Sequence, residues 1–322
     1  LSLVGSEMCI RDRQRAFTLI ELLVVIAIIA VLIGLLLPAI GKSRLAAWHV
    51  MSESNVHQIC IGAFTYQDNY KGYMPIVALK PGRGQVPDTA AGEAMINGGW
   101  LCSWTFGGKN TDGFWSAFGG GWMDNEAVDR PLNQYLYSGV MEPTDPATIL
   151  SPTATERDNL RLPVFRDPSD KASFQQQWSA TQVLNPNWGA IVSRNRYGIP
   201  INSYDDVGTS YHVNLKWHEQ LDAQPGISFA RAFFGGLRRL RYADSFVPSR
   251  MCWMHDQYAD IVVYNPSPGF QVRNGYGEFN KSVMGFMDGH AAYHKVIPGR
   301  AIESYRNDKY TFVYEDLRIP TN

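Results

Sequence analysis

The feature that most constrains this chain is an unbroken stretch of apolar side chains close to its start. Residues 22–37 read LLVVIAIIAVLIGLLL and contain no polar side chain. With residues 38–41 added, the stretch reaches about the 20 residues that a helix needs to cross a bilayer. We therefore expect a membrane segment at residues 17–41, followed by a more polar domain.

Composition excludes some classes of function. The formal net charge is −1, and Lys and Arg are scattered along the chain, so nucleic acid is not expected as a partner. The four cysteines, Cys9, Cys60, Cys102 and Cys252, form no CxxC pair, which argues against a zinc site of the usual spacing. If the domain lies outside the cytoplasm, a disulfide between Cys102 and Cys252 is one arrangement, and unpaired buried thiols are the other.

The residues before the apolar stretch are interpreted as a leader, residues 1–16. Residues 1–13 do not begin with Met, and we interpret them as translated adapter sequence. Positive charge before an apolar segment holds that end in the cytoplasm, and Arg15 supplies it. The domain after the segment is then expected outside the cytoplasm.

Glu21 is the one charged residue in the membrane segment. A carboxylate at the centre of a bilayer costs about 2.5–3.5 kcal/mol on insertion scales, and less near the end of the segment. Ionisable residues in such segments are functional candidates, because they need a partner there.

Residues 16–21, AFTLIE, together with the apolar stretch, resemble the N-terminal signature of type IV prepilins and type II secretion pseudopilins. In that family a membrane aspartyl peptidase cuts before the aromatic residue and methylates the new amine. The resemblance implies a cut between Ala16 and Phe17, and the positions of Glu21 and Pro38 match the family. Ala16 departs from the Gly that usually precedes the cut. A plain signal anchor and a secretory signal peptide are the alternatives, but the stretch exceeds a usual h-region and no A-x-A site follows it.

The expected processing gives Glu21 a partner. A new amine on Phe17 would carry positive charge beside the membrane, where Glu21 of a neighbouring subunit can pair with it. The pairing would set an axial stagger, and a repeated contact that does not close gives a helical filament. The expected partners are prepilin peptidase, like subunits and lipid of the inner (cytoplasmic) membrane, which the chain would cross once.

Beyond the membrane segment, residues 42–72 are expected to form an amphipathic half of the same helix. Pro38 is expected to kink it. Asn69 and Gly72 supply stop signals, so the helix should run from about residue 17 to about residue 70. The expected fold is α+β: a long N-terminal helix packed on the antiparallel sheet of a β-rich head, residues 73–322, as in a pilin-like roll.

The head shows short apolar stretches between turns. Residues 284–294 indicate a β-hairpin, because Asp288-Gly289 is a good tight-turn pair. The segment also resembles a strand–turn–strand found near the C-terminus of large pseudopilin-like proteins. The predicted strands are residues 252–254, 261–264, 282–287, 291–296 and 311–314.

Two other patterns in the head leave rival functions open. Trp100, Trp104, Trp115 and Trp122 lie in a glycine-rich region, and they either form an aromatic platform for sugar rings or a partner, or anchor a loop to the sheet. Asp256 and Asp288 follow apolar strands and could lie together, which suits a structural calcium ion. Alternatively, Asp288 is a turn residue chosen for backbone geometry.

The sequence favours a non-enzymatic structural subunit of a type IV pilus or a type II secretion pseudopilus-like filament. No G-x-S-x-G, H-E-x-x-H or P-loop motif is present. The first alternative is a carbohydrate- or partner-binding module displayed by a pilin-type anchor. The second is a membrane-tethered hydrolase that uses the Asp and His residues near the hairpin, which include His255, His290 and His294.

Overall fold

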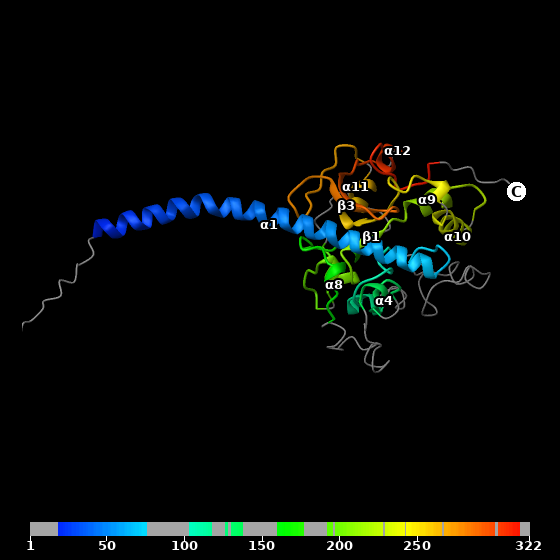
Figure 1. The fold of residues 1–322 in the computed structure, drawn as a ribbon, viewed down its shortest axis with the longest axis horizontal. Helices are drawn as coiled ribbons and strands as arrows, with labels where there is room; N and C mark the ends of the chain where they lie inside the picture. The colour runs from blue at the N-terminus through cyan, green and yellow to red at the C-terminus, as the bar shows by residue number, and fades with distance from the viewer. Residues whose placement is uncertain are drawn as a thin grey trace, which may run out of the picture. The chain divides into compact units, whose positions relative to one another are not determined.

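The computed structural model describes residues 19–75, 103–117, 126–127, 130–137, 160–176, 192–195, 197–227, 229–241, 243–265, 267–299 and 302–315. The chain divides into two compact units, Leu1–Ala46 and Ala47–Asn322. The second unit is called the head below. Helix α1, Leu19–Asn69, contributes to both units (Figure 1). The long helix expected from the sequence is therefore confirmed over the described residues.

Within the head, α1 buries one face. Val56, Ile59, Cys60, Ala63 and Tyr66 are at most 2% exposed, and their spacing of three and four residues places them on one side of the helix. The helix ends after Asn69. Gly72, which has a φ of 81°, donates its N–H to the carbonyl of Gln67 at 2.8 Å. A left-handed residue in this place closes the open carbonyls of a helix end, so the predicted stop at Gly72 is confirmed.

The helix packs against an antiparallel sheet of four strands in the described part of the head. The strands are β1 (Tyr211–Val213), β2 (Cys252–Asp256), β3 (Lys281–Phe286) and β4 (Ala291–Lys295), in the order β1-β2-β3-β4. The register pairs His212 with His255, and Met284 with Ala292. The expected α+β class, with a helix on an antiparallel sheet, is confirmed.

The predicted β-hairpin is formed by β3 and β4. Its turn is closed by two hydrogen bonds, from Phe286 N to His290 O and from Gly289 N to Phe286 O, each of 3.0 Å. Gly289 has a φ of 96°, a left-handed conformation that favours glycine. The Asp-Gly pair therefore predicted the turn, but only Gly289 takes the left-handed conformation, in a loop one residue longer than the tightest hairpin.

The sheet has a different layer on each face. On one face Trp253 donates its Nε1–H to the Sγ of Cys60 in α1 at 3.2 Å. On the other face lies α11, Gln257–Val263, where Val262 and Val263 pack with Met284 and Phe286 of β3. The sheet therefore separates two apolar cores of the described head, one under α1 and one under α11.

Two predicted strands are wrong. Residues 261–264 fall in α11 and its C-cap, and Asp256 starts that helix by accepting a hydrogen bond from Tyr258 N at 2.9 Å. A short apolar run has no period that distinguishes a helix from a strand, and for this reason the run was wrongly predicted as a strand. Residues 311–314 form no regular strand, and Thr311 only makes isolated bridges to Met251 and Arg306. The other three predicted strands correspond to β2, β3 and β4.

The remaining described elements are helical and short. They are α3 (Gly113–Ala117), α4 (Asn133–Leu136), η3 (Pro163–Phe165), α8 (Ser203–Val207), α9 (Lys216–Asp222), α10 (Phe229–Leu240), η4 (Ala243–Ser245) and α12 (Ile302–Tyr305). The sequence predicted none of them, nor β1.

Buried polar side chains hold the irregular part of the head together. The guanidinium of Arg130 donates to the carbonyls of Trp104, Gly107 and Val207 at 2.8–2.9 Å. The amide of Asn133 bonds both the N–H and the carbonyl of Gly108, at 2.8 and 2.7 Å. Buried backbone groups need hydrogen-bond partners. In this part of the head, side chains make the hydrogen bonds that neighbouring strands would make in a sheet.

Candidate functional site

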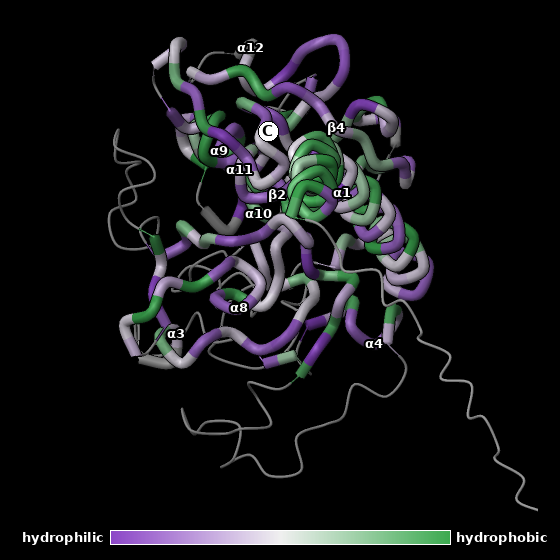
Figure 2. Tube along the Cα trace, turned by 90° about the vertical axis from the view of Figure 1, so that its left-hand side faces the viewer, coloured by the Kyte–Doolittle hydropathy of each residue, from purple (hydrophilic) through white to green (hydrophobic). Residues whose placement is uncertain are grey.

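The first unit presents an apolar helical surface. Residues 19–41 of α1 are all exposed, with Leu19 at 80% and Leu35 at 71%. Figure 2 shows these turns of α1 in green, the colour of apolar residues. This helix is long and apolar enough to cross a membrane, a test that a signal sequence also passes. Exposed apolar surface of this extent is covered by lipid or by other protein in a stable state.

Glu21 is the one charged side chain on that surface, and it lies in the first turn of α1. A carboxylate in this position complements the positive end of the helix dipole. Pro38 lies inside the same helix, where it cannot donate a backbone hydrogen bond. Ala16 and Phe17, the two positions of the predicted cut, lie outside the described residues.

The prokaryotic N-terminal methylation motif matches residues 11–37 of the chain, which include Glu21 and most of the apolar stretch. This N-terminus fits a type IV pilin-like protein. No curated protein and no solved structure matches the chain. The match also includes residues 11–13, part of the segment interpreted as adapter sequence, and that interpretation stays a prediction.

The motif explains why the helix is built as it is. It marks a structural pilin-type protein, a substrate of prepilin peptidase that assembles with pilin-like subunits. The exposed apolar half of α1 is consistent with anchoring in the inner membrane before assembly.

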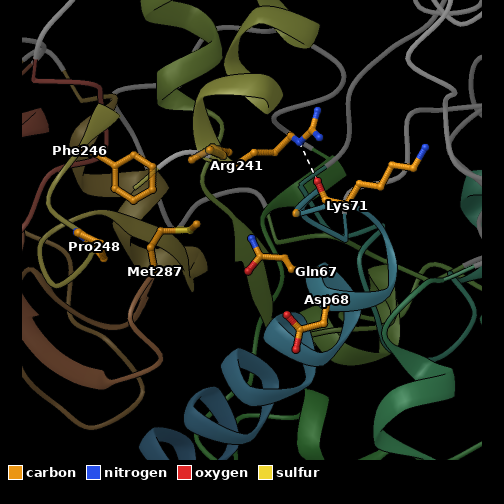
Figure 3. Close-up of a pocket in the computed structure, with 9 residues that line it drawn as sticks. Gln67, Asp68, Lys71, Arg241, Phe246, Pro248 and Met287 are labelled. Carbon is orange, nitrogen blue, oxygen red and sulfur yellow. Dashed lines mark hydrogen bonds between the residues drawn. The ribbon is translucent and has the colours of Figure 1, made fainter. Parts of the chain in front are cut away.

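The head has an open pocket of about 370 Å³ at the C-terminal end of α1. Figure 3 shows Gln67, Asp68 and Lys71 of α1 and its end on one side, and Phe246 and Met287 on the other. Arg241 donates from Nε to the carbonyl of Lys71 at 2.8 Å and stacks on Tyr73 at 4.3 Å. One wall of the pocket is therefore polar and the other is apolar. The contacts of Arg241 with Lys71 and Tyr73 hold the polar wall in place.

The two candidate calcium ligands do not come together. Asp256 lies at the end of β2 and accepts hydrogen bonds from Tyr258 N, Ser282 Oγ and Val283 N at 2.8–3.0 Å. Asp288 lies in the turn at the opposite end of β3 and accepts from His290 Nδ1 at 2.5 Å. The expectation that these carboxylates lie together is therefore wrong. The described residues contain no group of three or more metal-ligating side chains.

Two of the four candidate tryptophans are described, and both are buried. Trp104 is 3% and Trp115 0% exposed, with ring centroids 5.2 Å apart. Trp115 donates from Nε1 to Asp206 at 2.7 Å, so this ring anchors its loop. Neither ring presents a face to solvent, as a platform for sugar rings would require. Trp100 and Trp122 lie outside the described residues.

A buried ionic cluster was not predicted, although His255 belongs to it. Asp260 of α11 contacts His212 Nδ1 at 3.1 Å and pairs with Lys216 Nζ, which lies 3.2 Å from His255 Nε2. His255 donates from Nδ1 to the carbonyl of Asp256 at 2.8 Å, which leaves Nε2 to accept from Lys216. No spacing motif links these residues, and only the fold brings them together.

The charges within this cluster are set by burial and by Lys216. Burial and the neighbouring ammonium lower the pKa of His255 to about 3, so this imidazole is neutral. Burial alone would raise the pKa of Asp260, but the charge of Lys216 and the hydrogen bond from His212 hold it well below its usual range. In the part of the chain that the structure describes, no hydroxyl or thiol bonds either imidazole. The cluster therefore joins β1, β2, α9 and α11 as a buried ion pair, without an activated nucleophile.

Within the described residues, further buried aspartates form no ion pair. Asp170 accepts from Ser203 N, Tyr204 N and Ser210 Oγ at 2.6–3.1 Å, and burial raises its pKa to about 7. Burial raises the pKa of Asp206 to about 6 and that of Asp256 to about 7. These carboxyls accept hydrogen bonds from buried backbone and side-chain donors, which is a structural role.

The cysteines described by the structure carry free thiols. Cys60 and Cys252 are both buried. Cys9 and Cys102 lie outside the described residues. The predicted Cys102–Cys252 pairing involves a residue outside the described part of the chain, and Cys252 itself is a buried free thiol.

Proposed function

We propose that this chain is a structural subunit of a type IV pilus or a type II secretion pseudopilus-like filament. Prepilin peptidase would cut it between Ala16 and Phe17 and methylate the new amine. The observation that carries the proposal is the methylation motif at residues 11–37, which leads directly into the exposed apolar half of α1. Glu21, in the first turn of α1, is the residue that would form a salt bridge to the amine of a neighbouring subunit.

The proposed assembly step follows from electrostatics. An ammonium on Phe17 and a carboxylate on Glu21 are each unfavourable in an apolar environment, and pairing removes much of that cost. Since the two charges belong to different subunits, the pair fixes how far one helix is displaced along the next. The contact is head-to-tail and does not close on itself, so it propagates a filament.

The size of the head supports a specialised subunit. The second unit covers Ala47–Asn322, far more than a minimal pilin head needs, and we infer a secretion-type pseudopilin or a specialised surface subunit. Arg15 before the apolar stretch supports an orientation with the head outside the cytoplasm. The head would then lie on the outer side of the inner membrane or along the filament.

The decisive experiment is intact mass and N-terminal sequencing of the full chain, extracted from membranes after co-expression with prepilin peptidase. A mature chain that begins at N-methylated Phe17 supports the proposal. The Ala16→Glu variant should stay uncut, and the Ala16→Gly variant is the matched control that should be cut. An uncut wild-type chain beside an active peptidase would reduce the protein to a signal-anchored head.

A further inference from the structure

A small hairpin on the head exposes an aromatic side chain beside a cation. Residues 272–280 turn back on themselves, with Asn274 N bonded to Glu278 O at 2.9 Å and Asn280 N bonded to Val272 O at 3.0 Å. Phe279 is 51% exposed, and the guanidinium of Arg273 lies 5.6 Å from the centre of its ring. The pair is held on an ordered hairpin, so its exposure is a fixed property of the surface.

The strands next to this hairpin place two lysines opposite each other. Lys281 of β3 and Lys295 of β4 are register partners, so their side chains project from the same face of the sheet. Like charges in this arrangement destabilise a sheet. Glu278 pairs with Lys281 at 2.8 Å, but the ammonium of Lys295 has no hydrogen bond or ion pair within the described residues. A polyanionic partner would relieve the repulsion.

These residues lie beside the point where the chain enters the head. The ring of Tyr276 in the hairpin is 5.4 Å from that of His49 in α1, and the ring of Tyr293 in β4 is 4.3 Å from it. The ammonium of Lys281 lies 5.1 Å from the centre of the Tyr293 ring. The apolar stretch ends at residue 41. At a rise of 1.5 Å per residue, about 12 Å of helix lie between that residue and His49. A lipid headgroup layer and long basic side chains together span a distance of this order.

We propose that Arg273, Phe279, Lys281 and Lys295, the basic hairpin surface, bind anionic phospholipid headgroups of the membrane that holds the unassembled subunit. The proposal rests on the anchoring half of the proposed function. Basic side chains supply attraction to anionic headgroups, and an exposed aromatic ring favours the interfacial region. The surface would hold the head against the membrane until the subunit is extracted into a filament.

Lysine labelling in nanodiscs tests this contact directly. The full chain is reconstituted with phosphatidylcholine alone or mixed with phosphatidylglycerol, and a water-soluble acylating reagent labels exposed amines before mass spectrometry. We expect labelling of Lys281 and Lys295 to fall about fivefold in the anionic discs, the effect of about one cation held at the surface. Lys71, exposed at the other end of the head portion of α1, is the internal control and should label equally in both lipids.

Charge reversal separates headgroup binding from simple crowding by the disc. Lys295→Glu should restore Lys281 labelling in anionic discs, whereas the matched Lys71→Glu variant should not. Equal labelling of Lys281 and Lys295 in both lipids would overturn the proposal even if the chain is embedded. Failure of the chain to enter discs or float with vesicles would instead refute the anchoring on which both proposals rest.

Discussion

Gly285 of β3 lies where any side chain would collide with Cys60 of α1. A Cβ built at Gly285 would be 2.7 Å from the Cys60 Sγ and 2.8 Å from a methyl carbon of Val56. The absence of a side chain in the middle of the sheet therefore lets α1 approach the strand closely. This contact fixes the depth at which the helix lies on the sheet.

The Gly285→Ala substitution should destabilise the head by about 1–3 kcal/mol, the usual effect of overpacking. Chemical denaturation followed by circular dichroism measures it. Gly235 of α10 is the matched control, because a Cβ there meets nothing within 4 Å. Gly235→Ala should be neutral or slightly stabilising. Equal stability of the two variants would show that α1 does not pack on β3 as described.

The two buried tryptophans should respond differently to the loss of the indole N–H. Trp115→Phe leaves Asp206 with one donor fewer, and we expect a loss of about 1–3 kcal/mol. The buried Nε1 of Trp104 has no hydrogen-bond partner among the described residues, so Trp104→Phe should cost clearly less. Thermal unfolding of both variants gives the comparison. A larger loss for Trp104→Phe would mean that its N–H has a partner, such as an internal water molecule.

The buried aspartates predict an unusual pH dependence of stability. The pKa of Asp170 is raised to about 7 in the folded head, so its contribution to stability is fully present below the unfolded value of 3.8 and is lost as pH rises towards 7. Each such carboxyl contributes a slope of about 1.4 kcal/mol per pH unit in that window. Asp170→Asn should therefore flatten the decline in unfolding free energy between pH 4 and pH 7.

Asp205 offers a control of opposite sign for that experiment. Burial would raise the pKa of the Asp205 carboxyl, but the ion pair with Lys109, at 2.5 Å, outweighs the effect of burial. The pKa of Asp205 is therefore lowered. Its contribution is present above the unfolded value of 3.8 and is lost as pH falls through the lowered pKa. Asp205→Asn should change stability at the acidic end and leave the slope between pH 5 and pH 7 as in the wild type. An unchanged slope in Asp170→Asn would show that this carboxyl is ionised in the folded head at pH 5.

Glu21 should matter for assembly but not for processing. In a host that has both prepilin peptidase and filament machinery, we expect Glu21→Gln to be cut and methylated like the wild type but to be depleted from filaments by roughly tenfold or more, a loss of at least about 1.4 kcal/mol. Immunogold microscopy of sheared filaments and mass spectrometry of the N-terminus give the two readouts. Normal incorporation of Glu21→Gln would remove the proposed charge pair from the assembly step.

The sequence was most informative where one local rule decided the structure. The apolar period and the stop at Gly72 predicted α1, and Asp288-Gly289 predicted the turn between β3 and β4. Residues 261–264 were misassigned because the event that decides them, capping by Asp256, is a single hydrogen bond to a backbone N–H. Asp is a preferred N-cap residue, so the sequence did carry this signal, but the prediction followed the apolar run alone.

Sequence patterns could not predict the polar contacts between residues far apart in the chain. His212 and Asp260 are 48 positions apart, and Arg130 reaches a carbonyl 77 positions away. Their partners are backbone groups or single side chains in segments without a regular period. The candidate assembly helix was predictable for the opposite reason, because its chemistry lies in one continuous stretch of sequence.

The cysteines of the two apolar cores give the head a built-in reporter of how it opens. Cys60 lies in the core under α1 and Cys252 in the core under α11, with the sheet between them. Burial raises the pKa of Cys60 to about 12 and that of Cys252 well above its usual value, so neither thiol reacts while its layer is closed. The rate at which each thiol becomes alkylated therefore measures the detachment of one layer. An assembly machine that pulls on α1 would be expected to expose Cys60 before Cys252.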